Sequence, residues 1–192
     1  MQMGTPLQLL IFSLPSLVFV VFARLRGKAW RQALRDVGWT AGKPADYLRA
    51  LGALALLAAI AYPVLRLVPA ELMRGQSGYE GLRLTPVNVA RALIEQGIYI
   101  ALGEEILFRG LLAGWLQRRL GFAVGNWVQA LIFLAPHLLL LTVSKAIWPV
   151  FIVQLAAGWL QGWLRYRADS ILPGWLVHTA SNVSSALSAM LA

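Results

Sequence analysis

The feature that most constrains this chain is a series of apolar runs, each long enough to cross a lipid bilayer as a helix. A helix needs about 20 apolar residues to cross the hydrocarbon core, which is about 30 Å thick. Six such runs follow one another in the 192 residues, at about 7–23, 50–67, 89–116, 122–142, 146–164 and 171–191. The sequence therefore predicts an all-α fold, a polytopic transmembrane helix bundle with about six spans.

The composition agrees with a membrane protein and excludes several other classes. Hydrophobic residues make up 59% of the chain and charged residues 13%, whereas soluble domains average about 45–50% and about 25%. This apolar excess excludes intrinsic disorder. The chain has no Cys, which excludes a disulfide scaffold, thiolate metal sites and a Cys nucleophile. A single transmembrane domain is expected over residues 1–192.

The basic residues predict the orientation of the helices. The net charge is +9, and the positive residues lie between apolar runs, so the lipid bilayer rather than nucleic acid is the expected partner. Alternate loops carry eleven basic residues (at 24–49, 118–119 and 165–167) and five (at 66–91 and 145). The positive-inside rule places the eleven in the cytoplasm and both termini outward. A short amphipathic surface helix is expected at 28–37.

The third apolar run contains charges that a lipid-facing helix would not tolerate. Glu104, Glu105 and Arg109 lie within six residues, and each costs about 2.5–3.5 kcal/mol near the centre of a bilayer. They must therefore face a cavity lined by protein. Glu105 and Arg109 are four residues apart, share one helix face and are expected to form an ion pair. Glu104 is turned about 100° from Glu105 around the helix, so its carboxylate does not share Arg109 in the same way and is available for a functional role.

Both histidines also lie in apolar runs. His137 is in the fourth run and His178 in the sixth, with Asn182 one turn after His178 on the same face. A carboxylate in an apolar pocket is a stronger base than one in water. The set predicts hydrolysis by an activated water, in which Glu104 takes the proton with the assistance of His137. In this interpretation His178 and Asn182 donate hydrogen bonds to the oxyanion.

The same residues allow other interpretations. Glu104, His137 and His178 are also a possible ligand set for a divalent metal such as zinc, similar to the His₂Glu set of zinc peptidases. The metal-free mechanism without a cofactor is preferred, because Asn182 suits an oxyanion role better than a place around a metal. Buried ionisable residues also serve ion pathways and structural networks. The alternatives to an enzyme are therefore a non-catalytic membrane immunity or scaffold protein and a proton-coupled transporter.

Two pairs of glycines are spaced for close contact between helices. Gly110 and Gly114 lie in the third run, and Gly158 and Gly162 lie in the fifth. Small residues four apart let helix backbones approach within a membrane. The pairs predict tight packing between helices and leave the oligomeric state open.

Three motifs, taken in order, resemble a known family. Residues 104–109 read E-E-x-x-x-R, residues 133–137 read F-x-x-x-H, and residues 178–182 read H-x-x-x-N. Each motif lies on a different predicted span. Together they resemble the CAAX prenyl protease and bacteriocin-processing (CPBP) family of intramembrane proteases, also called Abi or type II CAAX protease-like. The likeness runs from about residue 92 to residue 182, roughly half of the chain.

The resemblance implies an all-helical membrane protein with its site inside the bundle, in a catalytic core at about 89–192. It implies hydrolysis of a peptide bond near the membrane-anchored end of a protein or peptide substrate. It makes Glu104, with His137, the base that activates water. It makes His178 and Asn182 the stabilisers of the oxyanion, and it gives Glu105 and Arg109 a supporting role. The family has been described both as metal-dependent and as glutamate-dependent. A chain this short is expected in a bacterial inner membrane, where it processes a peptide, a bacteriocin-like precursor or a C-terminal sorting helix.

Overall fold

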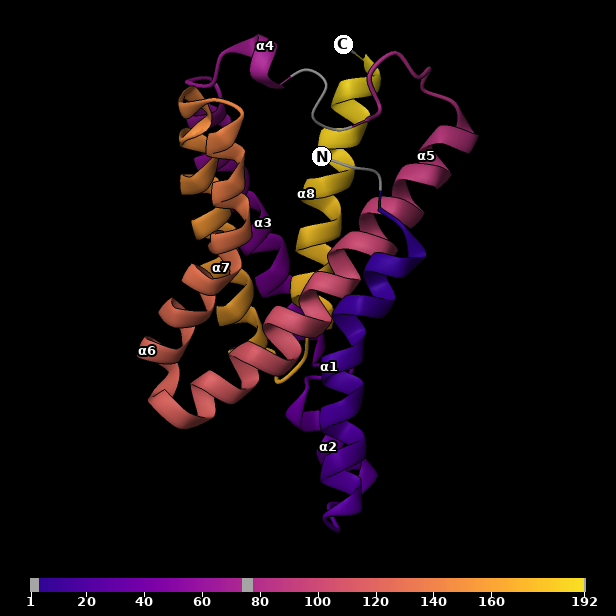
Figure 1. Ribbon diagram of the computed structural model, residues 1–192, viewed down its shortest axis with the longest axis vertical. Helices are drawn as coiled ribbons and strands as arrows, with labels where there is room; N and C mark the ends of the chain where they lie inside the picture. Colours follow the sequence, from indigo (N-terminus) through magenta and orange to yellow (C-terminus); the bar gives the residue numbers. More distant parts are fainter. Residues whose placement is uncertain (1–3, 74–77, 192) are drawn as a thin grey trace.

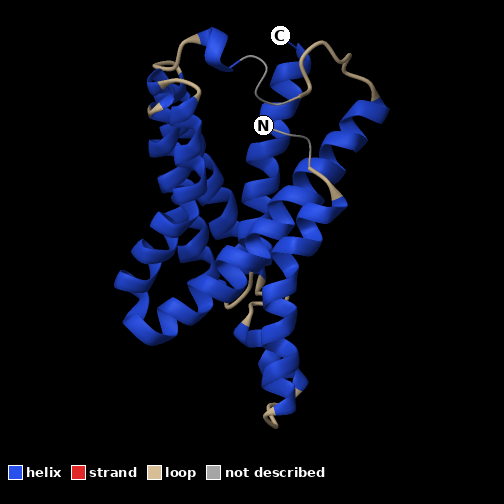
Figure 2. Cartoon of the chain, viewed as in Figure 1, coloured by secondary structure: helices blue, strands red, loops and turns tan. Residues whose placement is uncertain are grey.

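The structure is a computed structural model that describes residues 4–73 and 78–191. Within this part of the chain every regular element is a helix and no strand is present (Figure 2). The predicted all-α helix bundle is therefore confirmed.

The helices follow the apolar runs of the sequence, with short helices between them. In chain order they are α1 (Pro6–Leu25), α2 (Trp30–Asp36), α3 (Pro44–Leu65), α4 (Ala70–Met73), α5 (Pro86–Ala92), η1 (Leu93–Leu102), η2 (Glu105–Ala113), α6 (Gly114–Leu134), η3 (Ala135–Thr142), η4 (Lys145–Ile147), α7 (Pro149–Ala168) and α8 (Leu172–Leu191). The backbone is wound as a π-helix in η1 and η2 and as a 3₁₀-helix in η3 and η4. The short helix predicted at 28–37 is α2.

Four helical segments of the described chain are long and apolar enough to cross a membrane. They are Pro6–Leu25, Pro44–Leu65, Pro86–Thr142 and Lys145–Ala168. The third is 57 residues long and contains two of the predicted spans. It turns back at Gly121, whose φ of 75° lies in the left-handed region that favours glycine. The last predicted span, α8, has 20 residues but is not among the four, because polar side chains interrupt its apolar sequence.

The helix that carries the two glutamates lies at the centre of the bundle. The continuous run from α5 through η1 and η2 crosses the molecule obliquely, and α6 and α7 stand side by side next to its lower end (Figure 1). η1 packs against α8, η2 packs against α6 and α1, and α3 packs against α7 and α8. The Ser16 hydroxyl of α1 donates to the carbonyl oxygen of Ile106 at 3.0 Å. Segments far apart in the sequence therefore enclose the glutamates.

A buried polar network joins α6 to α7. Gln117 Nε2 donates to the carbonyl oxygen of Gly162 at 3.0 Å, and Gln129 Nε2 donates to that of Gly158 at 2.8 Å. Asn126 Oδ1 accepts from both glutamines at 3.2 Å. A Cβ atom at Gly162 would run into the side chains of Asn126 and Gln129. The close approach predicted from this glycine pair is therefore present, and buried amides fasten it.

The three basic loops meet at one end of the bundle. Arg118 Nη1 donates to the carbonyl oxygen of Asp36 at 2.9 Å. Arg165 Nη1 pairs with Asp169 Oδ1 at 3.0 Å, and its Nη2 donates to the carbonyl oxygen of Asp36 at 3.4 Å. The Thr40 hydroxyl donates to the carbonyl oxygen of Asp169 at 2.7 Å. These bonds bring together the loops that the positive-inside pattern places on one side.

At the other end of the bundle, Tyr79 connects the segment before α5 to η1. Its side chain is buried, and its hydroxyl donates to Glu95 Oε2 at 2.7 Å. Arg91 Nε donates to Glu95 Oε1 at 2.9 Å. Burial, together with the hydrogen bond to Glu95, raises the pKa of Tyr79 to about 12, so the hydroxyl keeps its proton into the alkaline range. Arg74, one of the five basic residues predicted at this end, lies outside the described residues.

Candidate active site

The central helix changes its winding where it carries the predicted site residues. The π-winding covers Leu93–Leu102 and Glu105–Ala113, and Glu104 lies in the short interval between the two segments. π-type turns are rare in proteins and are frequent at functional sites. Glu105 and Arg109 still lie on one face of this wider helix, since their side chains meet.

Two glycines allow α8 to come close to the central helix. A Cβ atom at Gly97 would approach Thr179 Cγ2 of α8 to 2.9 Å, and a Cβ atom at Gly174 would approach Glu105 Oε2 to 3.1 Å. Both distances are shorter than ordinary van der Waals contacts, so larger residues would push the helices apart. This close approach brings His178 of α8 to the two carboxylates.

The predicted ion pair between Glu105 and Arg109 is present. Arg109 Nη1 lies 3.3 Å from Glu105 Oε1, and both side chains are 0% exposed. The Arg109 guanidinium carbon also lies 3.9 Å from the centroid of the Phe133 ring, which is a cation–π contact. No nitrogen of Arg109 has a hydrogen-bond partner within the described part of the chain. The carboxylate and the ring therefore compensate this charge.

His178 lies between the two glutamates. Its Nδ1 is 3.0 Å from Glu105 Oε1, and its Nε2 is 3.7 Å from Glu104 Oε2. A carboxylate accepts a hydrogen bond, so Nδ1 carries the proton in this contact and Nε2 faces Glu104. The Glu104 side chain is 16% exposed and that of Glu105 is 0% exposed. One carboxylate is thus buried against Arg109 and His178, and the other keeps access to the site.

His137 lies in η3, and the ring of Phe133 at the end of α6 lies between it and the same centre. His137 Nδ1 donates to the carbonyl oxygen of Phe133 at 2.9 Å, which fixes the imidazole ring and leaves Nε2 free of that bond. The Phe133 ring lies 5.0 Å from His137 and 6.2 Å from His178, measured between centroids. Pro136 lies at the start of η3, so the fourth predicted span changes to a 3₁₀-helix before His137. Among the described residues, no ion pair joins His137 to Glu104.

Asn182 follows His178 by one turn of α8, as expected from the sequence. It is partly buried, and its side chain makes no hydrogen bond within the described part of the chain. The structure therefore brings Glu104, Glu105, Arg109 and His178 into contact, and Asn182 lies one helical turn beyond His178 on α8.

Two contacts of the site were not foreseen from the sequence. The bond between His178 and Glu105 depends on how α8 is placed against η2, which no pattern within either helix specifies. The position of the Phe133 ring against Arg109 depends on the packing of α6 against η2. For Phe133, the signal available in the sequence was the F-x-x-x-H spacing, which places Phe133 on the same helix face as His137.

A metal centre requires a converging set of ligands, and the site does not supply one. No group of three His, Asp or Glu side chains among residues 4–73 and 78–191 is arranged to hold a metal ion. Glu104, His137 and His178, the ligand set considered from the sequence, do not form such a group in this structure. The two histidines use Nδ1 for hydrogen bonds, to Glu105 and to the carbonyl oxygen of Phe133, and keep Nε2 for other contacts.

A comparison with protein families identifies the region that contains these residues. The model of the family described as type II CAAX prenyl endopeptidase, Rce1-like, matches residues 86–184. This region is just over half of the chain and extends from the start of α5 into α8. Neither the curated proteins nor the solved structures include a match.

Proposed function

From the premise that this chain belongs to the Rce1-like family of type II CAAX prenyl endopeptidases, we propose that it hydrolyses a peptide bond with a water activated by Glu104. At the level of the family the chain is a CAAX-type intramembrane protease and an integral membrane protein. The proposal adds the mechanism and the roles of individual side chains. It also places both termini on the outer side of a bacterial inner membrane.

In the proposed reaction, the Glu104 carboxylate removes a proton from water as the oxygen attacks the scissile carbonyl carbon. His137 assists by orienting this water through its free Nε2. Asn182 and His178 stabilise the negative oxygen of the tetrahedral intermediate by donating hydrogen bonds to it. The proton held by Glu104 then passes to the leaving amine as the carbon–nitrogen bond breaks.

The observation that carries the proposal is the unequal environment of the two adjacent carboxylates. Glu105 is fully buried and bound by Arg109 and by His178 Nδ1. Glu104 Oε2 lies 3.7 Å from His178 Nε2, and the Glu104 side chain is partly exposed. A general base must come within hydrogen-bond reach of the proton that it removes, and Glu104 is the one of the two carboxylates that water can reach.

The proposed substrate is a protein or peptide anchored in the membrane close to its scissile bond. Because the site lies inside a helix bundle, a substrate held by lipid presents its peptide bond at the depth of the site without crossing water.

The test compares variants of the two neighbouring glutamates. The purified full chain in lipid vesicles is given internally quenched peptides that carry a C-terminal apolar anchor. Glu104→Gln should abolish cleavage while the thermal unfolding temperature stays near that of the wild type. His137→Ala should also lose activity and keep its fold. Cleavage by Glu104→Gln at the wild-type rate would refute the assignment of the base.

A further inference from the structure

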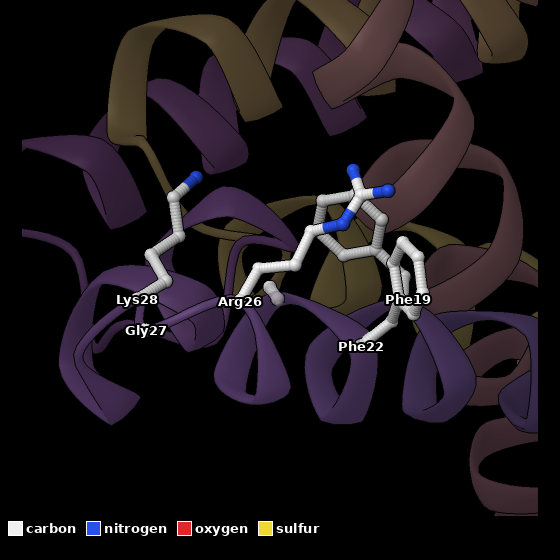
Figure 3. A pocket seen from close by; sticks show the side chains of 6 residues that line it. Phe19, Phe22, Arg26, Gly27 and Lys28 are labelled. Atoms are coloured by element: carbon white, nitrogen blue, oxygen red, sulfur yellow. The ribbon is translucent and has the colours of Figure 1, made fainter.

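A cavity outside the active site lies beside the connection between α1 and α2. Its volume is about 420 Å³. It is lined by Phe19, Phe22, Ala23, Arg26, Gly27 and Lys28. Figure 3 shows the two phenylalanine rings at one part of this cavity and the charged ends of Arg26 and Lys28 extending from the same connection. The cavity therefore has an apolar part and a cationic part.

The position of the cavity along α1 matches the boundary of a membrane. α1 has 20 residues and ends at Leu25, and at 1.5 Å per residue it spans about 30 Å, the thickness of the hydrocarbon core. Phe19, Phe22 and Ala23 lie in its last two turns. Arg26 and Lys28 follow its end directly, at the level of lipid headgroups.

The two cations differ in their partners. The Arg26 guanidinium lies 4.2 Å from the Phe22 ring centroid, and its side chain is exposed and makes no hydrogen bond or ion pair within the described residues. Lys28 is paired with Asp36 of α2 and remains partly exposed. Arg26 is therefore free to bind an anion, and Lys28, which also lines the cavity, is held by α2.

We propose that this cavity binds one anionic phospholipid. Its phosphate contacts Arg26 and Lys28, and the first part of an acyl chain lies along Phe19 and Phe22. Arginine is well suited to phosphate oxygens because its guanidinium presents several donors in one plane. A free phosphate ion uses only the cationic part of the cavity, whereas a lipid uses both parts. The site is separate from the proposed proteolytic centre.

Binding is measured on the detergent-solubilised full chain by native mass spectrometry during titration with phosphatidylglycerol. The wild type should retain one phosphatidylglycerol and bind phosphatidylcholine of the same chain length more weakly. Arg26→Gln should weaken the apparent affinity for phosphatidylglycerol about fivefold, the effect of one cation near an anionic lipid surface. Arg26→Lys keeps the charge and should retain most of the affinity.

The matched control is Arg66→Gln. Arg66 also follows the end of an apolar helix, α3, and lies 4.3 Å from the ring centroid of Tyr62 four residues earlier, but it does not line the cavity. Equal losses from the Arg26 and Arg66 variants would overturn the location of the site, and equal binding of the two lipids would overturn its anionic specificity. Displacement of the lipid by inorganic phosphate at the same concentration would overturn a lipid as the occupant.

Discussion

At the scale of single residues, a fully buried arginine is the most demanding side chain in this protein. Removing a charge from water costs several kcal/mol, which must be offset by its surroundings. Arg109 is offset by Glu105 at 3.3 Å and by the face of Phe133 at 3.9 Å. Glu105 also binds His178. The charge pair therefore connects the stability of the helix to the orientation of the histidine.

Breaking this pair should destabilise the protein strongly. Glu105→Gln or Arg109→Met alone leaves one buried charge without its partner, and a loss of about 3–5 kcal/mol is expected. The double variant leaves no net charge and should recover much of this loss, because similar volumes replace both partners. Thermal unfolding of the four proteins in one detergent measures the coupling. Strictly additive losses would show that the two side chains do not stabilise each other.

Cleavage should be insensitive to removal of divalent metals. In the proposed mechanism water is activated by Glu104, and the residues present do not converge as metal ligands. Activity on an anchored peptide is measured before and after dialysis against a chelator, together with elemental analysis of the protein. Loss of activity in chelator that zinc restores would contradict the proposed chemistry and leave the ion pair prediction unaffected.

At the scale of helices, the site is supported by the contact between α6 and α7. Gly158 and Gly162 of α7 let the two helices approach, and the amides of Gln129 and Asn126 fill the contact. Gly158 also faces Phe133, whose ring a Cβ atom would approach to 3.1 Å. The packing of α7 therefore holds the ring that contacts Arg109.

Adding a methyl group at Gly162 should weaken this contact. Gly162→Ala would force the side chains of Asn126 and Gln129 aside, and a loss of about 1–3 kcal/mol is expected from overpacking. Gly52→Ala is the matched control, because Gly52 also lies inside a long helix and a Cβ atom there meets nothing within 4 Å. It should be neutral or stabilising by up to about 1 kcal/mol. Equal effects of the two changes on thermal unfolding would argue against the packing explanation.

At the scale of the whole molecule, the basic residues of the loops are divided unequally between the two ends of the bundle, eleven at one end and five at the other in the sequence. The connection after α1, the first part of α6 before Gly121 and the last turn of α7 are tied together by Arg118 and Arg165. Arg118 and Arg165 therefore have a structural role, in addition to the membrane orientation that their positions in the sequence predict.

The orientation can be tested cleanly because the chain has no Cys. Single cysteines at Leu120 and Val87, both exposed, lie at the basic end and at the start of α5 respectively. In intact bacterial cells a membrane-impermeant thiol reagent should label Val87→Cys and should label Leu120→Cys only after permeabilisation. The reverse labelling would invert the proposed topology.

Much of the helical framework could be predicted from local sequence, but the turn inside the long central segment could not. The runs at 89–116 and 122–142 were predicted as two spans, and the structure separates them by a reversal of the chain at Gly121. The positive φ of Gly121 belongs to the turn between two helices, and the apolar pattern indicates only the helices on either side of it. His137 lies within the predicted fourth run, in a part where Pro136 lies at the start of a 3₁₀ segment and not in a further turn of α-helix.

The sequence by itself determined which residues lie in helices, and it specified the contact between Glu105 and Arg109, because both depend on the spacing of side chains along one helix. Only the tertiary structure decided that His178 bonds Glu105 and faces Glu104, and that Phe133 covers Arg109. These contacts join different helices. Within a membrane their register depends on close packing at small residues such as Gly97 and on buried polar bonds, which no single segment contains.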